Sequence, residues 1–149
     1  MRTIGLLALL LSSISSLAQP VDLAGGLVAY YPFNGNANDE SGNGNHGVVR
    51  GATLTADRFN NSGSAYQFCD STYIELPPNV CIYGNFTIPL WVNVKQFSSW
   101  GRIIEFGSGQ WTNNVAISAA FEDTDKPCLS LCNSSGCNNI VSETGMESN

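Results

Sequence analysis

Few residues in this chain have the types and spacing that an enzyme active site needs. The carboxylates are scattered: Glu75 and Glu105 each stand alone among apolar neighbours, and residues 122–125 form an acidic run typical of a solvated turn. The one histidine, His46, lies in a glycine-rich loop with no nucleophile paired to it nearby in the sequence. Because acid–base and nucleophilic catalysis need such groups in pairs, the sequence predicts a protein that is not an enzyme.

Oxygen-bearing side chains gather in the same loop and suggest a calcium site. Asp39, Asn38 and Asn43 could supply the carboxylate and amide oxygens that Ca²⁺ prefers. The spacing differs from an EF-hand loop, because Asp39 stands where that loop needs glycine and no glutamate closes it. The favoured alternative is that Asp39 and its asparagine neighbours accept hydrogen bonds from backbone amides in turns. Calcium is the one cofactor that the sequence suggests.

Tryptophans next to polar side chains suggest a glycan site. A sugar ring stacks on an exposed aromatic ring, and amide or carboxylate groups nearby bind its hydroxyls. Trp111 with Asn113 and Asn114 is the first candidate, and Trp100 beside Arg102 is the second. The alternative, which is more common for tryptophans in a β-sandwich, is packing in the core or at the rim.

The first 18 residues have the three-part layout of a secretory signal peptide. A basic start at Arg2 precedes an apolar run over residues 4–11, and the small residues Ser16 and Ala18 stand before Gln19. The apolar run is well short of the ~20 residues that span a bilayer. We therefore expect cleavage after Ala18, an extracellular mature chain and no membrane insertion.

The five cysteines of an exported chain are candidates for disulfides. We predict the local pairs Cys69–Cys81 and Cys132–Cys137, which leave Cys128 over. Cys128 and Cys132 are four residues apart on one expected strand, so their Cα atoms are separated by roughly 13 Å. That distance is greater than a disulfide spans.

Three Asn-x-Ser/Thr triplets, which begin at Asn60, Asn85 and Asn133, are predicted N-glycosylation sites. They would be used only in a eukaryotic host.

The mature chain is acidic and poor in charged residues. Without Arg2 it has five basic residues against twelve acidic ones, a formal charge of −7. Nucleic acid and anionic lipid are not attracted to such a surface, so we exclude both as partners. Charged residues make up 12% of the chain, about half the usual share. Glycine and asparagine are abundant instead, which favours strands and turns over long helices.

Apolar residues alternate with a period of two, and residues 19–149 show no sustained helical spacing. The expected strands cover residues 27–33, 66–68, 74–76, 86–94, 102–106, 115–121 and 129–131. The clearest alternation places Phe86, Ile88, Leu90, Val92 and Val94 on one face of a strand. Turn residues separate these runs, above all in the Asn/Gly loop over residues 34–47. The pattern predicts one all-β domain with two packed antiparallel sheets.

Several segments, taken in order, resemble the laminin-G-like jelly-roll domains of the concanavalin A-like lectin and glucanase superfamily. The matching stretches are LVAYYPFNGNANDESGNGNHG (residues 27–47), SAYQF (64–68), YIELP (73–77), NFTIPLWV (85–92) and RIIEFGSG (102–109). The resemblance implies a two-sheet jelly roll over residues 24–149, and calcium is sometimes bound at the rim of such domains. It also implies a non-catalytic extracellular module that binds glycan or protein in recognition or cell adhesion.

The resemblance leaves two other functions open, namely an accessory domain of a larger carbohydrate-active enzyme and a purely structural matrix fragment. The Glu-x-Asp-x-Glu strand of the glucanase branch is absent.

Three features depart from the family pattern. Cys69-Asp70 stands where the family usually has Asp-Gly, and Pro89 lies inside the clearest strand, where it favours an edge or a bulge. The family pattern continues past Leu131 with further strands, and residues 133–149 contain none that match. The sequence therefore predicts a jelly roll truncated at its C-terminal end, with poor solubility.

Overall fold

The computed structural model describes residues 25–78, 80, 84–107 and 113–148. This part of the chain contains eight strands and no helix, which confirms the predicted all-β class. No helix among the described residues has the length and apolar character needed to cross a membrane. The chain divides between Pro77 and Pro78 into two compact units.

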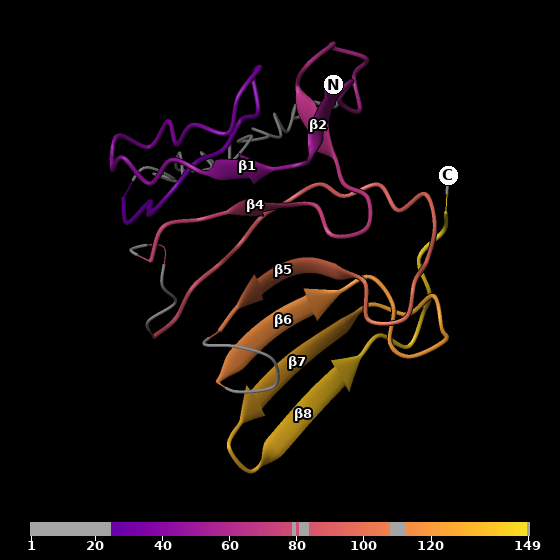
Figure 1. The fold of residues 1–149 in the computed structure, drawn as a ribbon. Coiled ribbons are helices and arrows are strands. Elements are labelled where there is room, and N and C mark those ends of the chain that lie inside the picture. Colours follow the sequence, from indigo (N-terminus) through magenta and orange to yellow (C-terminus); the bar gives the residue numbers. More distant parts are fainter. Residues whose placement is uncertain (1–24, 79, 81–83, 108–112, 149) are drawn as a thin grey trace, which may run out of the picture. The chain divides into compact units, whose positions relative to one another are not determined.

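Unit 1, residues 1–77, contains two short antiparallel pairs (Figure 1). Strand β1 (Val48–Arg50) pairs with β4 (Tyr73–Glu75), and β2 (Thr53–Thr55) pairs with β3 (Ala65–Gln67). An exposed ion pair of 2.9 Å between Arg50 and Glu75 joins β1 to β4. Most of the described residues of this unit, 25–77, lie in loops, so side chains rather than ladders carry much of their hydrogen bonding.

Unit 2, residues 78–149, is built on one four-stranded antiparallel sheet in the order β5-β6-β7-β8 (Figure 1). Its strands are β5 (Arg102–Phe106), β6 (Asn114–Ser118), β7 (Cys128–Asn133) and β8 (Gly136–Val141). The β5–β6 register shifts between Arg102 and Ile104, which is a β-bulge, whereas the other two pairs are regular.

The more buried face of this sheet carries small and polar side chains. Ala116 and Ser118 on β6 and Cys128, Ser130 and Cys132 on β7 are all buried. The large apolar residues lie on the other face in two cross-strand rows, where Leu131 and Ile140 are exposed. Hydrophobic alternation alone would have placed these large residues inward, whereas the small and polar residues occupy the buried positions.

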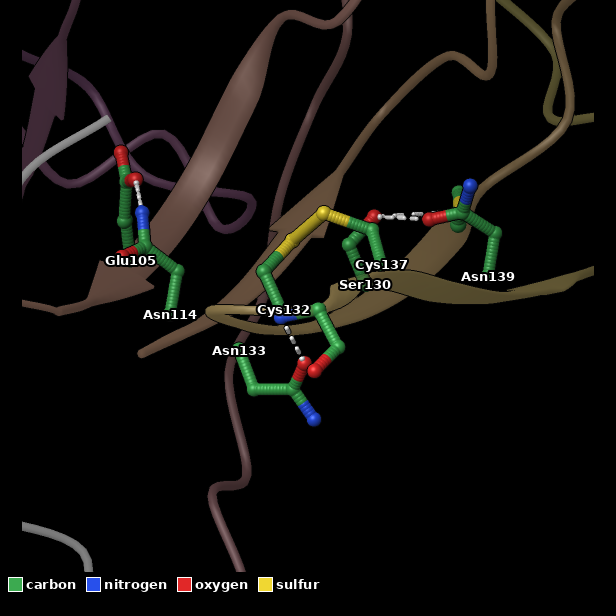
Figure 2. Close-up of a disulfide and its surroundings, with 9 residues drawn as sticks. Glu105, Asn114, Ser130, Cys132, Asn133, Cys137 and Asn139 are labelled. Atoms are coloured by element: carbon green, nitrogen blue, oxygen red, sulfur yellow. Dashed lines mark hydrogen bonds between the residues drawn. A yellow bond between two sulfur atoms is a disulfide. The ribbon is translucent and has the colours of Figure 1, made fainter. Parts of the chain in front are cut away.

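A tight hairpin joins β7 to β8. Asn133 pairs with Gly136, so the loop between them has the two residues Ser134 and Ser135. The Asn133 side-chain oxygen accepts a hydrogen bond of 2.8 Å from the Ser135 backbone N–H. One pair further from the turn, Cys132 faces Cys137 in register and their sulfurs form a disulfide (Figure 2).

Five expected strands correspond to observed ones, namely those at residues 66–68, 74–76, 102–106, 115–121 and 129–131. The expected strand over residues 27–33 is wrong, because its backbone groups bond instead to side chains and backbone of the Asn/Gly loop. The one over residues 86–94 is also wrong, since this segment joins no ladder of the described chain. Strands β1, β2 and β8 were missed. In β8 the central Asn138-Asn139 breaks the alternation of apolar residues.

Candidate functional sites

Asp39 is the centre of a hydrogen-bond network in unit 1. The residue is buried, with 5% of its surface exposed. One of its oxygens accepts from the backbone N–H groups of Tyr30 (2.9 Å) and Ser41 (2.8 Å). The other accepts from the Ser41 hydroxyl and the Asn45 backbone N–H, both at 2.9 Å. Burial opposes ionisation, but these hydrogen bonds outweigh it and hold the pKa of Asp39 well below its usual range.

Two asparagines extend this network to the segment before the loop. The Asn43 amide donates to the backbone oxygens of Leu27 (2.8 Å) and Val28 (3.1 Å), and the Asn45 amide donates to Val28 at 2.9 Å. The segment also donates to the loop, since the Tyr31 hydroxyl donates a hydrogen bond to the Asn45 backbone oxygen. The loop and the segment 27–31 are therefore held together by side chains in place of a strand ladder.

His46 completes the network through its ring. Its Nδ1 accepts a hydrogen bond of 3.1 Å from the backbone N–H of Asp39. This contact uses the Nδ1 lone pair, so the neutral ring carries its proton on Nε2. His46 thus acts as a turn acceptor here, and the structure places no nucleophile in contact with it among the described residues.

The geometry favours the turn-organising role of Asp39 over calcium binding. Four donors occupy the carboxylate, and the Asn43 amide nitrogen faces the Leu27 and Val28 carbonyls. Asn38 is exposed, and its backbone N–H donates to the Asn36 side chain. Within the described ranges, no three His, Cys, Asp or Glu side chains are grouped closely enough to hold a metal ion.

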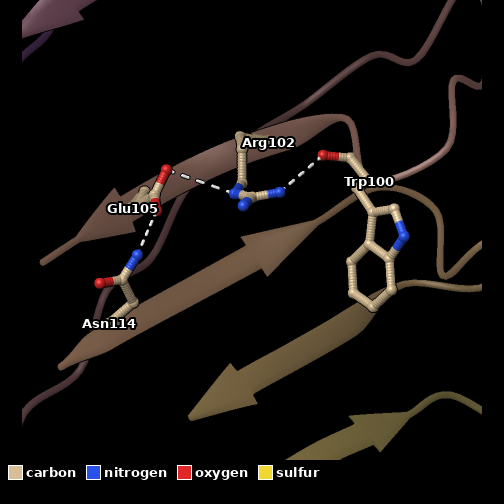
Figure 3. Close-up of polar contacts among 4 residues, drawn as sticks. All are labelled: Trp100, Arg102, Glu105 and Asn114. Atoms are coloured by element: carbon tan, nitrogen blue, oxygen red, sulfur yellow. Dashed lines mark hydrogen bonds and ion pairs between the residues drawn. The ribbon is translucent and has the colours of Figure 1, made fainter. Parts of the chain in front are cut away.

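A second network, at β5 and β6 of unit 2, links three side chains and the backbone oxygen of Trp100 in a row (Figure 3). The Asn114 amide donates to Glu105 at 2.6 Å, and the other Glu105 oxygen pairs with Arg102 at 3.3 Å. Arg102 also donates to the Trp100 backbone oxygen at 2.9 Å. We call Trp100, Arg102, Glu105 and Asn114 the β5–β6 polar row.

The bulge in β5 is what allows this row to form. Arg102 and Glu105 are three residues apart, so a regular strand would place their side chains on opposite faces. The register shift puts Arg102 opposite Ser118 and Glu105 opposite Ala116, which lie on the same face of β6. The extra residue of the bulge therefore brings both charged groups to one side of the sheet.

The exposure of the row decreases from its charged pair to Asn114. The Arg102 and Glu105 side chains are 30% and 36% exposed, whereas Asn114 is buried. The Asn114 amide oxygen has no hydrogen-bond partner among the described residues. The Trp100 ring is half-buried and packs edge-on against Phe121, with ring centroids 5.0 Å apart.

The first predicted glycan site stays a prediction, because Trp111 lies outside the described residues. Asn113 has a left-handed backbone with φ of 50°, and Asn114 is buried with its side chain on Glu105. The second candidate, Trp100 beside Arg102, is part of the polar row. Sequence reasoning missed Glu105, because the bulge that aims it at Arg102 has no signal in the alternation of residues.

The four cysteines that the structure describes divide between one disulfide and two free thiols. Cys132 and Cys137 form the predicted disulfide. Cys128, which the predicted pairs left over, has a buried free thiol. Cys69 has an exposed free thiol, and its expected partner Cys81 lies outside the described residues, so that pairing stays a prediction. The three predicted glycosylation sites, Asn60, Asn85 and Asn133, are exposed.

Comparison with known proteins supports the fold class. The chain matches no protein-family model and no curated protein sequence. A search of solved structures finds an S-layer domain-containing protein from Clostridium thermocellum, with a TM-score of 0.54 and 22% sequence identity. The similarity covers 80% of this chain and 58% of the neighbour's, so this chain spans less than two thirds of its length. At this identity the likeness shows a shared fold.

Proposed function

We propose that this protein is a secreted recognition module that binds glycans at the β5–β6 polar row without catalysing a reaction on them. The observation that carries the proposal is the row itself. It joins a guanidinium, a carboxylate and an amide in one hydrogen-bonded series over β5 and β6, which ends on the backbone oxygen of Trp100, the residue that carries the aromatic ring. These are the groups that stack on a sugar face and bind its hydroxyls.

The row is organised before a ligand arrives. Arg102 is held between Glu105 and the Trp100 carbonyl, and Asn114 is held on Glu105. Side chains that are already ordered lose little conformational entropy on binding, which favours affinity.

A non-catalytic role is supported by the carboxylate count of the row. Glycoside hydrolysis uses two carboxyl groups on opposite sides of the scissile bond. Glu105 is the one carboxylate in the row, and both its oxygens already bond to Arg102 and Asn114. A single paired carboxylate suits hydroxyl recognition better than acid–base catalysis.

An extracellular location is supported by three independent features. The first 18 residues have the layout of a signal peptide. The sequence resembles laminin-G-like jelly-roll domains, and the structural neighbour is named for an S-layer domain. Together they favour a module that works outside the cell or at its surface.

A glycan array probed with the labelled mature chain tests the proposal. Binding to a defined set of glycans is expected, and Trp100→Ala or Glu105→Gln should weaken it by about tenfold or more. Trp91→Ala is the matched control, because Trp91 is exposed in the same unit but lies outside the row. EDTA should leave binding unchanged, since no step depends on calcium. Binding that survives Trp100→Ala and Glu105→Gln, or hydrolysis of a bound glycan, would contradict the proposal.

A further inference from the structure

The two charged side chains of the β5–β6 polar row are paired with each other. Arg102 Nε lies 3.3 Å from one Glu105 carboxylate oxygen, and the other oxygen accepts a hydrogen bond of 2.6 Å from Asn114 (Figure 3). Trp100 and Asn114 are neutral, so the one positive and the one negative charge of the row cancel at pH 7. A ligand at the row therefore meets a guanidinium and a carboxylate side by side.

The fold holds this pair in place. The bulge in β5 directs both side chains to one face of the sheet, and Arg102 is also held by the Trp100 backbone oxygen at 2.9 Å. The Arg102 and Glu105 side chains are 30% and 36% exposed, so each is partly withdrawn from solvent. Partial burial reduces screening by water and salt, which favours the paired state. A ligand close to one charge is therefore also close to the other.

An acidic group on a sugar would be opposed at the row. A carboxylate or sulfate that approached Arg102 would also meet Glu105, and like charges placed together across an interface weaken binding. The Phe121 ring packs against the Trp100 ring with centroids 5.0 Å apart, and the acidic run at residues 122–125 follows Phe121 directly. The field of this acidic chain therefore adds to the repulsion of an anionic ligand.

A cationic group would also lack a matching partner, because an ammonium that approached Glu105 would meet Arg102. Sugar hydroxyls differ from both, since each hydroxyl can donate and accept a hydrogen bond. They can bind to a paired donor and acceptor without separating the two charges. The row is therefore matched to ligands whose polar groups are hydroxyls.

We propose that the glycans bound at the β5–β6 polar row are neutral, and that the Arg102–Glu105 pair excludes their acidic counterparts, which carry uronic acid, sialic acid or sulfate. This inference rests on the proposed function and names the ligand class of the same site. Glu105 determines the specificity, because it cancels the charge by which Arg102 would otherwise attract an acidic sugar.

Matched pairs of glycans on an array test the proposal. Each pair consists of a neutral oligosaccharide and the same oligosaccharide with one acidic group: galactosides with and without sialic acid or sulfate, and glucose oligomers with and without a terminal glucuronic acid. For the pairs that the wild-type chain binds, the neutral member should bind at least about tenfold more tightly. Its dissociation constant should change little between ~0.05 and ~0.5 M salt, since no net charge is neutralised on binding.

Two charge variants should shift this preference in opposite directions. Glu105→Gln leaves Arg102 as the only charge of the row, so the preference for the neutral member should fall by about tenfold or more. Arg102→Gln leaves Glu105 alone, so acidic members should be rejected more strongly than by the wild type. Loss of a purely structural role would weaken both members alike and leave their ratio unchanged.

Glu75→Gln is the matched control. It removes the same charge from another Arg–Glu ion pair, the one with Arg50 in unit 1, and it leaves the row intact. The ratio of the two affinities should stay at the wild-type value. Circular dichroism checks that each variant keeps its strand content.

The outcomes separate this inference from the proposed function. Glycan binding that Trp100→Ala weakens, but that favours acidic or amine-bearing glycans or ignores charge, would overturn the inference and keep the row as a glycan site. A ratio that Glu105→Gln and Arg102→Gln leave unchanged, or move in the same direction, would also overturn it. The absence of binding to any glycan would refute the proposed function, and this inference with it.

Discussion

The Cys132–Cys137 disulfide closes the β7–β8 hairpin and makes a quantitative test of how unit 2 is stabilised (Figure 2). The two cysteines are separated by five positions, so the bond closes a loop of about six residues. The chain-entropy relation then assigns it about 2 kcal/mol of stability, through restriction of the unfolded chain. Replacing both cysteines by serine should lower the free energy of unfolding by that amount, or Tm by about 10 °C.

Urea unfolding followed by tryptophan fluorescence measures this change. The matched control is Ser134→Ala, which changes an exposed residue of the same turn, keeps the disulfide and should leave the midpoint unchanged. Reduction of the wild-type chain should reproduce the double variant. A loss below about 0.5 kcal/mol would refute the entropy argument, since that is within the range of ordinary surface substitutions. An equal loss for Ser134→Ala would show that the effect is not specific to the disulfide.

The loops and the export signal can be tested in the same way. Asp39→Asn should speed hydrogen exchange of the amides that the carboxylate accepts from. The pKa of Asp39 is lowered in the folded chain, so the stabilisation from its carboxylate should be complete above about pH 4 and should be lost as the pH falls further. NMR spectra across about pH 2–7 should show this acid dependence in the wild type, and Asp39→Asn should abolish it. Gly107→Ala should lower the free energy of unfolding by about 1–3 kcal/mol, because a Cβ at this position would overlap the Asn114 side-chain amide. Thermal unfolding measures the change, and an unchanged Tm would refute this packing. N-terminal sequencing of the secreted chain should begin at or near Gln19, and an intact Met1 would contradict export by cleavage.

The pattern of apolar and turn residues was sufficient to predict those parts of the fold that depend on neighbours close along the chain. Five of the expected strands were placed correctly, because alternation bounded by turn residues marks a half-buried strand. The Cys132–Cys137 pair follows from short spacing across a polar turn. The favoured role of Asp39 as a turn acceptor agrees with its four hydrogen bonds, because Asp next to Gly and Asn commonly bonds to nearby backbone.

Pattern failed where the partner of a segment lies elsewhere. Residues 27–33 and 86–94 alternate as well as any strand here, but a ladder needs a second backbone in register. The first segment finds side chains of the Asn/Gly loop instead, through Asp39, Asn43 and Asn45. Strand β8, with poor alternation, forms because a two-residue turn after Asn133 folds it directly back onto β7.

The sequence by itself determined the all-β class, the acidic and weakly charged composition, and the short-range turns, since each depends on residue type and on neighbours close along the chain. Only the tertiary structure decided which side chains meet. Arg102 and Glu105 share one face because one extra residue bulges out of β5, and Asn114 reaches Glu105 only through the pairing of β5 with β6. A shift of one residue in a strand reverses the face of every side chain beyond it, so the β5–β6 polar row depends on a register that residue order alone does not specify.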